Sequence, residues 1–315
     1  MPEPTIDLLA DYERLEREGG VAVVRRDGVE VAGPEAERYL QGQLSQEVVA
    51  LADGACTWSL VLQPTGKVDA WVRVSRLAPE HYLLDVDEGA GDALAARLRR
   101  FLLRTKAEVS DPRRWTARAV RSPGDRRVLG GADGADGGLV RCPAVGPGVV
   151  GHDLLSQGDG AGPEPEGHVR PESFERYRIA HAVPAMGAEL TEDTIPAEAG
   201  QWLVEASVSF AKGCYTGQEL VARIDSRGGN VPRPVRLLVV EGGSTPAVGG
   251  AVTCEGVEVG AVTSSTPWLA HHQPALALAP LRRTVEVGAA VEVETDAGRA
   301  PGVVVEPPFE GHGPG

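Results

Sequence analysis

The residues most suited to chemistry lie in one short segment, Lys212–Glu219, which reads K-G-C-Y-T-G-Q-E. Thr216 followed three residues later by Glu219 is the pattern of a capping box, which predicts that a helix begins directly after Thr216. Cys214 would then stand just before the positive end of a helix dipole, two residues from the ammonium group of Lys212. Both features favour the thiolate, so the segment predicts a reactive cysteine. A small buried cysteine is an equally open interpretation of the same residue.

The length and composition are typical of a globular chain with two or three structural units. The chain has 315 residues, 42% hydrophobic and 24% charged, and its 40 Gly and 24 Pro predict many turns. The formal charge of −14 and the pI near 5.0 disfavour direct nucleic-acid binding, which depends on Lys and Arg contacts to phosphates. The polar N-terminus and the absence of a long apolar run predict a cytoplasmic protein that does not enter a membrane.

The other cysteines and histidines do not form a recognisable metal motif. Cys56, Cys142, Cys214 and Cys254 lie far apart and none belongs to a C-x-x-C pair, so no permanently bound metal is predicted. His271 and His272 are adjacent, and adjacent strand residues point to opposite faces. A loop is therefore a better interpretation of this pair than a shared metal site.

Hydrophobic patterning predicts alternating strands and helices in the first third of the chain. The dipeptide Asp27-Gly28 lies between two short β-rich runs and is a hairpin signal. Val68, Ala70 and Val72 alternate as expected for a strand. We expect strands at 21–24, 29–31, 58–62, 68–74 and 81–86, and helices at 34–46 and 89–106.

The middle of the chain is rich in glycine and the C-terminal part is rich in short β-segments. Weak strands are expected at 128–129 and 149–155, a flexible Gly/Pro-rich loop at 157–167, and a helix from Pro171 onward. From 235 to 305, apolar runs alternate with Gly and Pro, which predicts a small antiparallel β-barrel. We therefore expect an α+β protein with an N-terminal region at 1–234 and a barrel domain at 235–315.

Lys212–Glu219 matches the signature K-G-C-Y-x-G-Q-E of the YgfZ family at every fixed position, and the chain resembles that family over roughly residues 20–240. Supporting matches lie at 39–48, 62–68, 101–106, 195–198 and 223–230. The resemblance implies a T-protein-like folate-binding fold, in which several modules surround a central cavity that holds tetrahydrofolate. It also implies a role in the assembly or maintenance of iron–sulfur proteins, especially [4Fe–4S] enzymes, including those that thiomethylate tRNA. The implied partners are folate and the iron–sulfur client enzymes or assembly proteins.

The resemblance also assigns roles to particular residues. Cys214 is the implied functional thiol, assisted by Lys212. The residues implied to support the motif are Gly213, Tyr215, Gly217, Gln218, Glu219 and Arg223, and those implied to contact folate are Gln43, Gln63, Arg178, Glu198 and Arg227.

Two departures from the T-protein pattern bear on activity. The T-protein has an aspartate that assists the folate nitrogen, and this chain has Ala70 or Trp71 there, with Asp69 out of register. Ala180 stands where the T-protein has an acidic residue that contacts the pterin. Without a carboxylate, general-base assistance to aminomethyl transfer is lost. Whether the chain is an enzyme stays open, and the alternatives are a tetrahydrofolate-dependent aminomethyltransferase or demethylase and a non-catalytic adaptor for client proteins.

Overall fold

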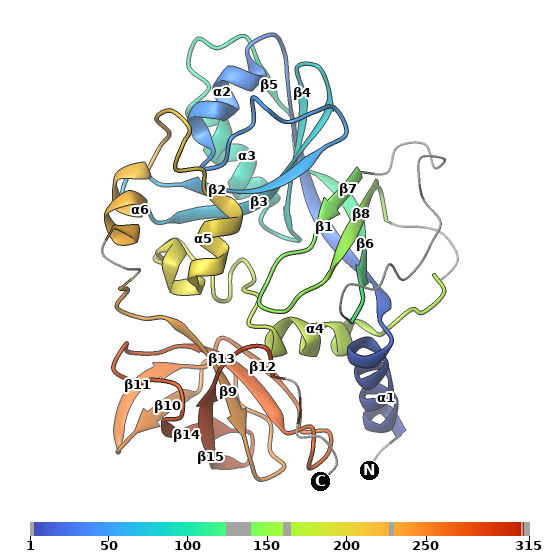
Figure 1. Ribbon diagram of the computed structural model, residues 1–315, viewed down its shortest axis with the longest axis vertical. Coiled ribbons are helices and arrows are strands. Elements are labelled where there is room, and N and C mark those ends of the chain that lie inside the picture. The colour runs from blue at the N-terminus through green and yellow to red at the C-terminus, as the bar shows by residue number, and fades with distance from the viewer. Residues whose placement is uncertain (1–2, 124–139, 160–164, 227–229, 310, 312–315) are drawn as a thin grey trace.

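Two curled antiparallel sheets, joined through a central helix, form the molecule (Figure 1). The computed structural model describes residues 3–123, 140–159, 165–226, 230–309 and 311. Within these residues the first sheet has the strand order β2-β3-β4-β1-β6-β8-β7, with β5 beside β1. Its strands are β1 (Gly20–Ala32), β2 (Cys56–Leu62), β3 (Val68–Ala78), β4 (His81–Asp87), β5 (Glu108–Val109), β6 (Arg113–Arg121), β7 (Val140–Pro143) and β8 (Gly151–Gln157).

The second sheet is C-terminal and begins at residue 235, where the barrel domain was expected to start. Its order is β11-β10-β14-β15-β9-β13-β12, and a bridge between Gly260 and Leu281 brings β11 towards the end of β13. The strands are β9 (Val235–Val240), β10 (Ala251–Cys254), β11 (Val257–Ala261), β12 (Ser264–Thr266), β13 (Ala275–Pro280), β14 (Ala290–Thr295) and β15 (Gly298–Val305). The short, polar β12 was not predicted, because it lacks an apolar alternation.

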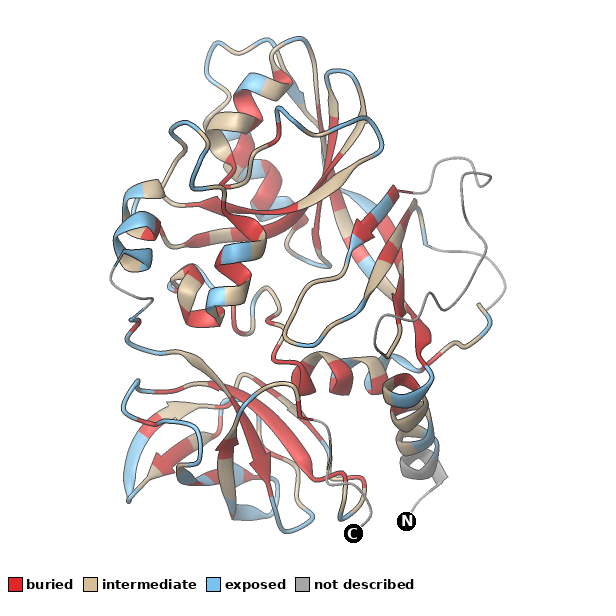
Figure 2. Cartoon of the chain, in the orientation of Figure 1, coloured by how far each residue is buried: buried red, intermediate tan, exposed pale blue. Residues whose placement is uncertain are grey.

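Helices cover one face of the first sheet and fill the space between the two sheets. Helices α2 (Ala36–Gln43) and α3 (Gly91–Arg100) pack on β1, β3 and β4 and bury Tyr39, Leu94 and Leu98 against them. Helix α4 (Pro171–Ala180) lies between the sheets, beside α1 (Glu3–Arg17). One apolar cluster joins α1, α4 and the C-terminal sheet through Leu15, Ile179 and Leu276, and buried positions therefore continue from one sheet to the other (Figure 2).

The predicted hairpin at Asp27-Gly28 is wrong, because β1 runs through it without a turn. The strand pairs with β4 on one side and β6 on the other. The Asp27 carboxylate accepts hydrogen bonds from the backbone N–H groups of Gly89 and Gly91, where α3 begins. A Cβ at Gly28 would lie 2.3 Å from Cδ1 of Trp115. The dipeptide thus serves helix capping and close packing rather than chain reversal.

Most other predicted elements are confirmed. The strands at 58–62, 68–74 and 81–86 correspond to β2, β3 and β4, and the helix from Pro171 to α4. The helix expected at 89–106 ends at Arg100, six residues early, and the helix expected at 34–46 spans 36–43. The strand expected at 149–155 is β8, whereas 128–129 and part of the loop 157–167 lie outside the described residues.

No helix in the described ranges combines the length and the apolar character needed to cross a membrane.

Candidate functional site

The motif segment holds the predicted helix, but not through the predicted cap. Helix α6 spans Gln218–Asp225, and its N-cap position falls on Gly217, which has no side chain to act as a cap. The Gln218 side chain instead accepts a hydrogen bond from the Tyr215 N–H at 3.2 Å, and the Thr216 N–H donates to the Gly42 carbonyl. The capping box is therefore wrong in mechanism, although the helix begins within one residue of the expected position.

Two glycines allow the motif to pack against the turn that joins β2 to β3. Gly217 has a φ of 81° and a Cβ there would lie 2.5 Å from the Gln63 carbonyl oxygen. Gly66 has a φ of 83°, and its Cβ would lie 2.4 Å from Cβ of Leu220. Any larger residue at either position would force the turn and α6 apart. Two segments that the sequence analysis treated separately therefore form one unit.

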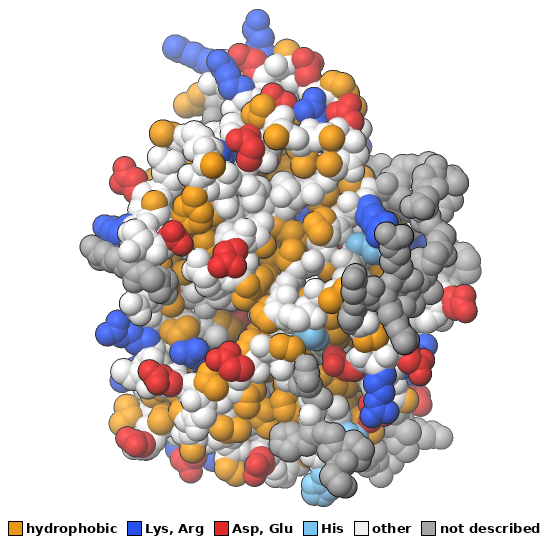
Figure 3. Space-filling model, in the orientation of Figure 1, with side chains coloured by type: hydrophobic (Ala, Val, Ile, Leu, Met, Phe, Trp, Pro, Cys, Tyr) orange, Lys and Arg blue, Asp and Glu red, His pale blue; other side chains and the backbone are white. Residues whose placement is uncertain are grey.

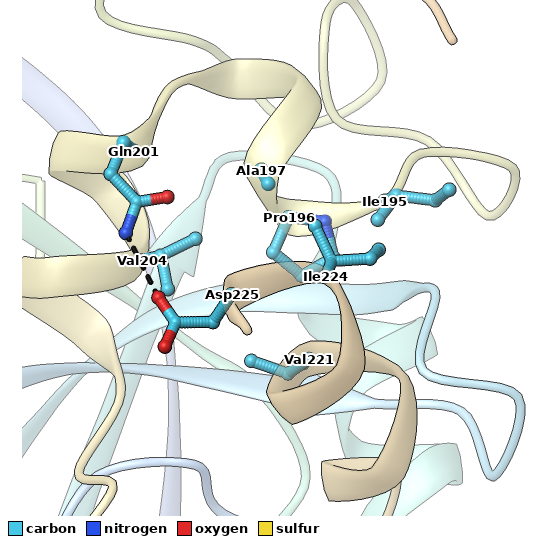
Figure 4. A pocket seen from close by; sticks show the side chains of 8 residues that line it. All are labelled: Ile195, Pro196, Ala197, Gln201, Val204, Val221, Ile224 and Asp225. Atoms are coloured by element: carbon cyan, nitrogen blue, oxygen red, sulfur yellow. Dashed lines mark hydrogen bonds between the residues drawn. The ribbon is translucent and has the colours of Figure 1, made fainter. Parts of the chain in front are cut away.

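Helix α6 also packs on η1 (Pro196–Ala199) and α5 (Gln201–Ser207) (Figure 4). Val221 and Ile224 face this interface, and the Gln201 side-chain amide donates to the Asp225 carboxylate at 3.3 Å. The space between these elements is only about 10 Å³. This is about the space that one water molecule needs, so the interface anchors the helix and is too small for a ligand.

Cys214 is exposed, and Lys212 beside it is half-buried. The Lys212 ammonium donates to the carbonyl oxygens of Leu44 and Gln46, at 2.8 Å each, and lies 5.4 Å from the centre of the Tyr215 ring. Burial lowers the pKa of Lys212 to about 8, although the Glu47 carboxylate acts in the opposite direction. Lys212 therefore attaches the motif to the segment that follows α2, while Cys214 remains accessible from solvent.

A cavity of about 270 Å³ lies inside the curl of the first sheet, where the sheet faces α4. Hydrophobic side chains gather at the centre of the face shown in Figure 3, between the two sheets. Trp58 and Trp71 line the cavity and stack on each other, with ring centroids 4.1 Å apart. Its remaining lining comes from Val24, Arg25, Arg26, Arg73, Asp87, Ala119, Arg121, Ala144, Val145, Val149, Asp153, Phe174, Glu175, Tyr177, Arg178, Val183, Pro184 and Ala185.

A chain of alternating charges forms one wall of this cavity. The fully buried Asp85 carboxylate accepts from Arg26 Nε at 2.9 Å and from Arg73 Nη2 at 2.5 Å. Arg73 also pairs with Asp153, which accepts from Arg121 at 2.7 Å. Burial by itself would raise the pKa of Asp153, but Arg121 and Arg73 outweigh it and lower the pKa to about 2. Each of these buried side chains thus has an oppositely charged partner inside the protein.

This charge network was not predicted from the sequence, although β3 and β4 contain residues that point to it. Arg73 and Asp85 each stand between buried apolar neighbours of their strand, and residues 73 and 85 are directly opposite each other in the β3–β4 ladder. Asp87 is likewise opposite Arg26 and pairs with it. A charged residue in a buried strand indicates that a partner of opposite charge lies nearby. Which residue is that partner depends on the order of the strands in the sheet.

The structure places only part of the implied folate set at the cavity. Arg178 lines it, bonded to Glu175 and to the buried Glu189, and these carboxylates raise its pKa against the effect of burial. Trp202 meets Trp71 edge-on at 6.0 Å.

Three other implied contacts make hydrogen bonds away from the cavity lining, and one is not described. Gln43 accepts from Arg97, Gln63 donates to the Glu192 carbonyl, and Glu198 accepts from the N–H groups of Ile195 and Arg233. Arg227 lies outside the described residues. Neither Cys214 nor Arg223 is among the residues that line the cavity.

The structure also shows the surroundings of Asp69 and Trp71, where the sequence departs from the T-protein pattern. Val61 pairs with Ala70 and Leu62 with Val68, so Asp69 is the extra residue of a β-bulge. The Asp69 carboxylate accepts from Arg97 at 2.6 Å, while Trp71 faces the cavity. Elsewhere, His272 bonds to Glu13 and His271 contacts the ring of Trp268.

Comparisons with known proteins identify related chains. No family model matches the chain. It is 29% identical over 203 residues to an uncharacterized protein of Haemophilus influenzae, covering 64% of this chain and 67% of that one. It is 26% identical over 251 residues to the mitochondrial iron–sulfur cluster assembly factor IBA57 homolog of Neurospora crassa, covering 74% and 56%. It is 26% identical over 237 residues to the tRNA-modifying protein YgfZ of Pectobacterium carotovorum, covering 64% of each. The alignments thus cover between 56% and 67% of the length of these relatives.

The fold comparison covers nearly the whole chain. The glycine cleavage system aminomethyltransferase T of Bartonella henselae superposes with a TM-score of 0.73, covering 96% of this chain and 89% of that one, at 16% identity. The protein therefore has the T-protein-like fold. Together with the relatives named YgfZ and IBA57, this fold supports a YgfZ-type, T-protein-like protein.

Proposed function

We propose that the protein is a folate-binding accessory factor for the assembly or maintenance of iron–sulfur proteins, especially [4Fe–4S] enzymes, and that it thereby supports tRNA thiomethylation. Cys214 is its functional thiol, and tetrahydrofolate occupies the central cavity. The observation that carries the proposal is the cavity itself, which joins stacked tryptophans to arginines within a T-protein-like fold. The names of the IBA57 and YgfZ relatives supply the iron–sulfur and tRNA connections.

The cavity lining fits a folate-like ligand. Its volume of about 270 Å³ is close to the lower end of small-molecule sites, which are about 300–1,000 Å³. Trp58 and Trp71 offer aromatic surface to a flat heterocycle, and Arg25 and Arg178 are cations at the same cavity. These residues would hold the pterin and the acidic part of the ligand.

The same lining argues against one-carbon transfer as the main activity. Bound tetrahydrofolate supplies a nitrogen that accepts one-carbon units. Among the described lining residues, the Asp87, Asp153 and Glu175 carboxylates all accept hydrogen bonds from arginines. A carboxylate held in an ion pair is a poor general base, so these three carboxylates are poorly suited to accept the proton in such a transfer.

Ligand binding is tested by calorimetric titration of the full chain with 5-formyltetrahydrofolate. Trp71→Leu is expected to weaken binding about tenfold, because it removes an aromatic wall of the cavity. The matched control is Trp268→Leu, since Trp268 packs on the C-terminal sheet cluster and does not line the cavity. Absence of binding to the wild-type chain, or equal loss in both variants, would reject folate as the cavity ligand.

The role of the thiol is tested in cells that lack the protein. The readout is the activity of a [4Fe–4S] tRNA-thiomethylating enzyme after wild type, Cys214→Ala or the control Cys254→Ala is added back. Rescue by wild type and Cys254→Ala alone supports the proposal. Full rescue by Cys214→Ala removes the thiol from the mechanism.

A docking role for the motif is the second candidate. Phe210, in the same segment as Cys214, is 53% exposed, and Val49 is 50% exposed. Exposed large apolar side chains are typical of surfaces that bind other proteins. In this case Cys214→Ser would be tolerated in cells, whereas Phe210→Ser would abolish rescue without changing folate affinity.

A further inference from the structure

The two edge strands of the first sheet, β2 and β7, meet because the sheet curls. In the strand order they are the first and last members, yet Trp58 Nε1 on β2 donates to the Pro143 carbonyl on β7 at 2.8 Å. This hydrogen bond crosses the gap between the edges. One cysteine lies on each edge strand, Cys56 at the start of β2 and Cys142 near the end of β7.

Several contacts bring these two cysteines together. Cys56 lies directly opposite Ser75 in the β2–β3 ladder, and opposite residues project from the same face of a sheet. The Ser75 hydroxyl is 3.6 Å from Cys142 Sγ. Cys56 also packs against the apolar cluster that contains Cys142. Both cysteines therefore lie at the same apolar cluster, next to Ser75.

The two thiols differ in a way that suits sequential chemistry. Cys142 is fully buried, whereas Cys56 is partly exposed and can be reached from solvent. The neighbouring Cys56 side chain, through hydrogen bonding, and then burial raise the pKa of Cys142. An accessible first sulfur with a buried second sulfur beside it is the arrangement of an attacking and a resolving thiol.

We propose that Cys56 and Cys142 are a redox pair that forms a reversible disulfide between β2 and β7. The oxidant is a low-molecular-weight disulfide of the glutathione class. The Cys56 thiolate attacks one sulfur of that disulfide and releases the first small thiolate, leaving a mixed disulfide. Cys142 then attacks Cys56 Sγ, its proton passes to the second departing thiolate, and the protein disulfide forms. The protein pair loses two electrons and two protons, and the small disulfide is reduced to two thiols.

This bond would fix one wall of the cavity. Trp58, two residues from Cys56, lines the cavity, and Pro143 leads directly into Ala144 and Val145, which also line it. A covalent link between β2 and β7 therefore holds both parts of this wall together. The inference does not depend on which ligand the cavity binds.

The test uses the full chain with Cys214 and Cys254 replaced by serine, so that only the proposed pair remains. The protein is equilibrated in buffers of oxidised and reduced glutathione, alkylated after denaturation, and analysed by peptide mapping. We expect a linked Cys56–Cys142 peptide, with joint loss of alkylation at both residues at one potential and recovery with dithiothreitol. Cys142→Ala should instead stop at a glutathione adduct on Cys56. A glutathione adduct on Cys56 beside a fully alkylated Cys142 in the parent protein, or no reaction at either residue, would overturn the proposal.

The unsubstituted chain provides the second measurement. Hydrogen exchange of residues 143–149 is compared between the oxidised and reduced forms, and slower exchange in the oxidised form is expected. Equal exchange rates would refute the effect on the cavity wall even if the disulfide forms.

Discussion

The central cavity and the motif surface, residues 210–223, are built on opposite physical principles. One wall of the cavity depends on buried charges with oppositely charged partners, as Asp85 has in Arg26 and Arg73. The motif surface presents an exposed Cys214, held in place by main-chain contacts through Lys212 and Gly217. The cavity is therefore sensitive to the loss of a side-chain charge, whereas the motif surface is sensitive to backbone geometry. The cavity and the motif surface can thus change independently in one chain.

The largest effect on stability is expected from Asp85→Ala, which removes a carboxylate from the charge network of the cavity. Removal of this carboxylate leaves the buried guanidinium groups of Arg26 and Arg73 without their shared acceptor. The free energy of unfolding, measured by urea denaturation, should fall by about 3–5 kcal/mol. The control is Asp111→Ala, which breaks an exposed ion pair with Arg99 and should cost less than about 1 kcal/mol. Equal losses in the two variants would show that the cavity wall does not depend on its charge network.

The motif surface is tested by two glycines of the same segment. Gly217→Ala places a Cβ 2.5 Å from the Gln63 carbonyl at a φ of 81°, and should reduce the free energy of unfolding by about 2–4 kcal/mol. Gly213→Ala is the matched control, because no atom lies within 4 Å of its Cβ position. A similar small effect at both positions would contradict the packing of the motif against the β2–β3 turn.

In the motif surface, Lys212 is expected to make the free energy of unfolding depend on pH. Its pKa of about 8 in the folded protein is below the ordinary 10.5, so between these values the unfolded chain binds more protons. The free energy of unfolding should therefore gain a contribution as the pH rises from about 8 to 10.5. A neutral amine still has two N–H groups for the carbonyls of Leu44 and Gln46. Lys212→Met should be less stable overall and should lose this part of the pH slope, and an unchanged slope would assign it to another group.

The smallest effect on stability is expected at Cys214. Its side chain is exposed, so Cys214→Ser should change the free energy of unfolding by less than about 0.5 kcal/mol. A loss above about 2 kcal/mol would show that the thiol has a structural role, and any loss of activity in cells would then have to be attributed to misfolding.

Local patterns predicted the elements whose own residues carry the periodicity. The alternation of Val68, Ala70 and Val72 indicated β3, and all three residues are buried, Ala70 and Val72 in the cluster with α2 and α3 and Val68 in the cluster with α5 and α6. Proline at the start of α4 indicated where that helix begins. The C-terminal runs of apolar residues indicated a β-rich region, and the second sheet lies there.

Predictions were wrong where a local sequence pattern was compatible with two different structures. Asp27-Gly28 is a turn signal in isolation, but here the carboxylate caps α3 and the glycine makes room for Trp115. Thr216 and Glu219 have capping-box spacing, but the N-cap falls on Gly217 because the approach of Gln63 requires glycine there. In both cases a contact from a distant part of the chain decided between the uses.

The fold class, most of the elements, and the position of the motif helix with Cys214 before it could be predicted from the sequence. Helices and strands depend on interactions within a few residues, which spacing and residue type record directly. The pairing of Asp85 with Arg26 and Arg73, the stacking of Trp58 on Trp71 in a cavity, and the proximity of Cys56 to Cys142 became visible in the folded chain. The pattern of a strand shows which side chains share a face, whereas the order and curl of the strands determine which faces meet.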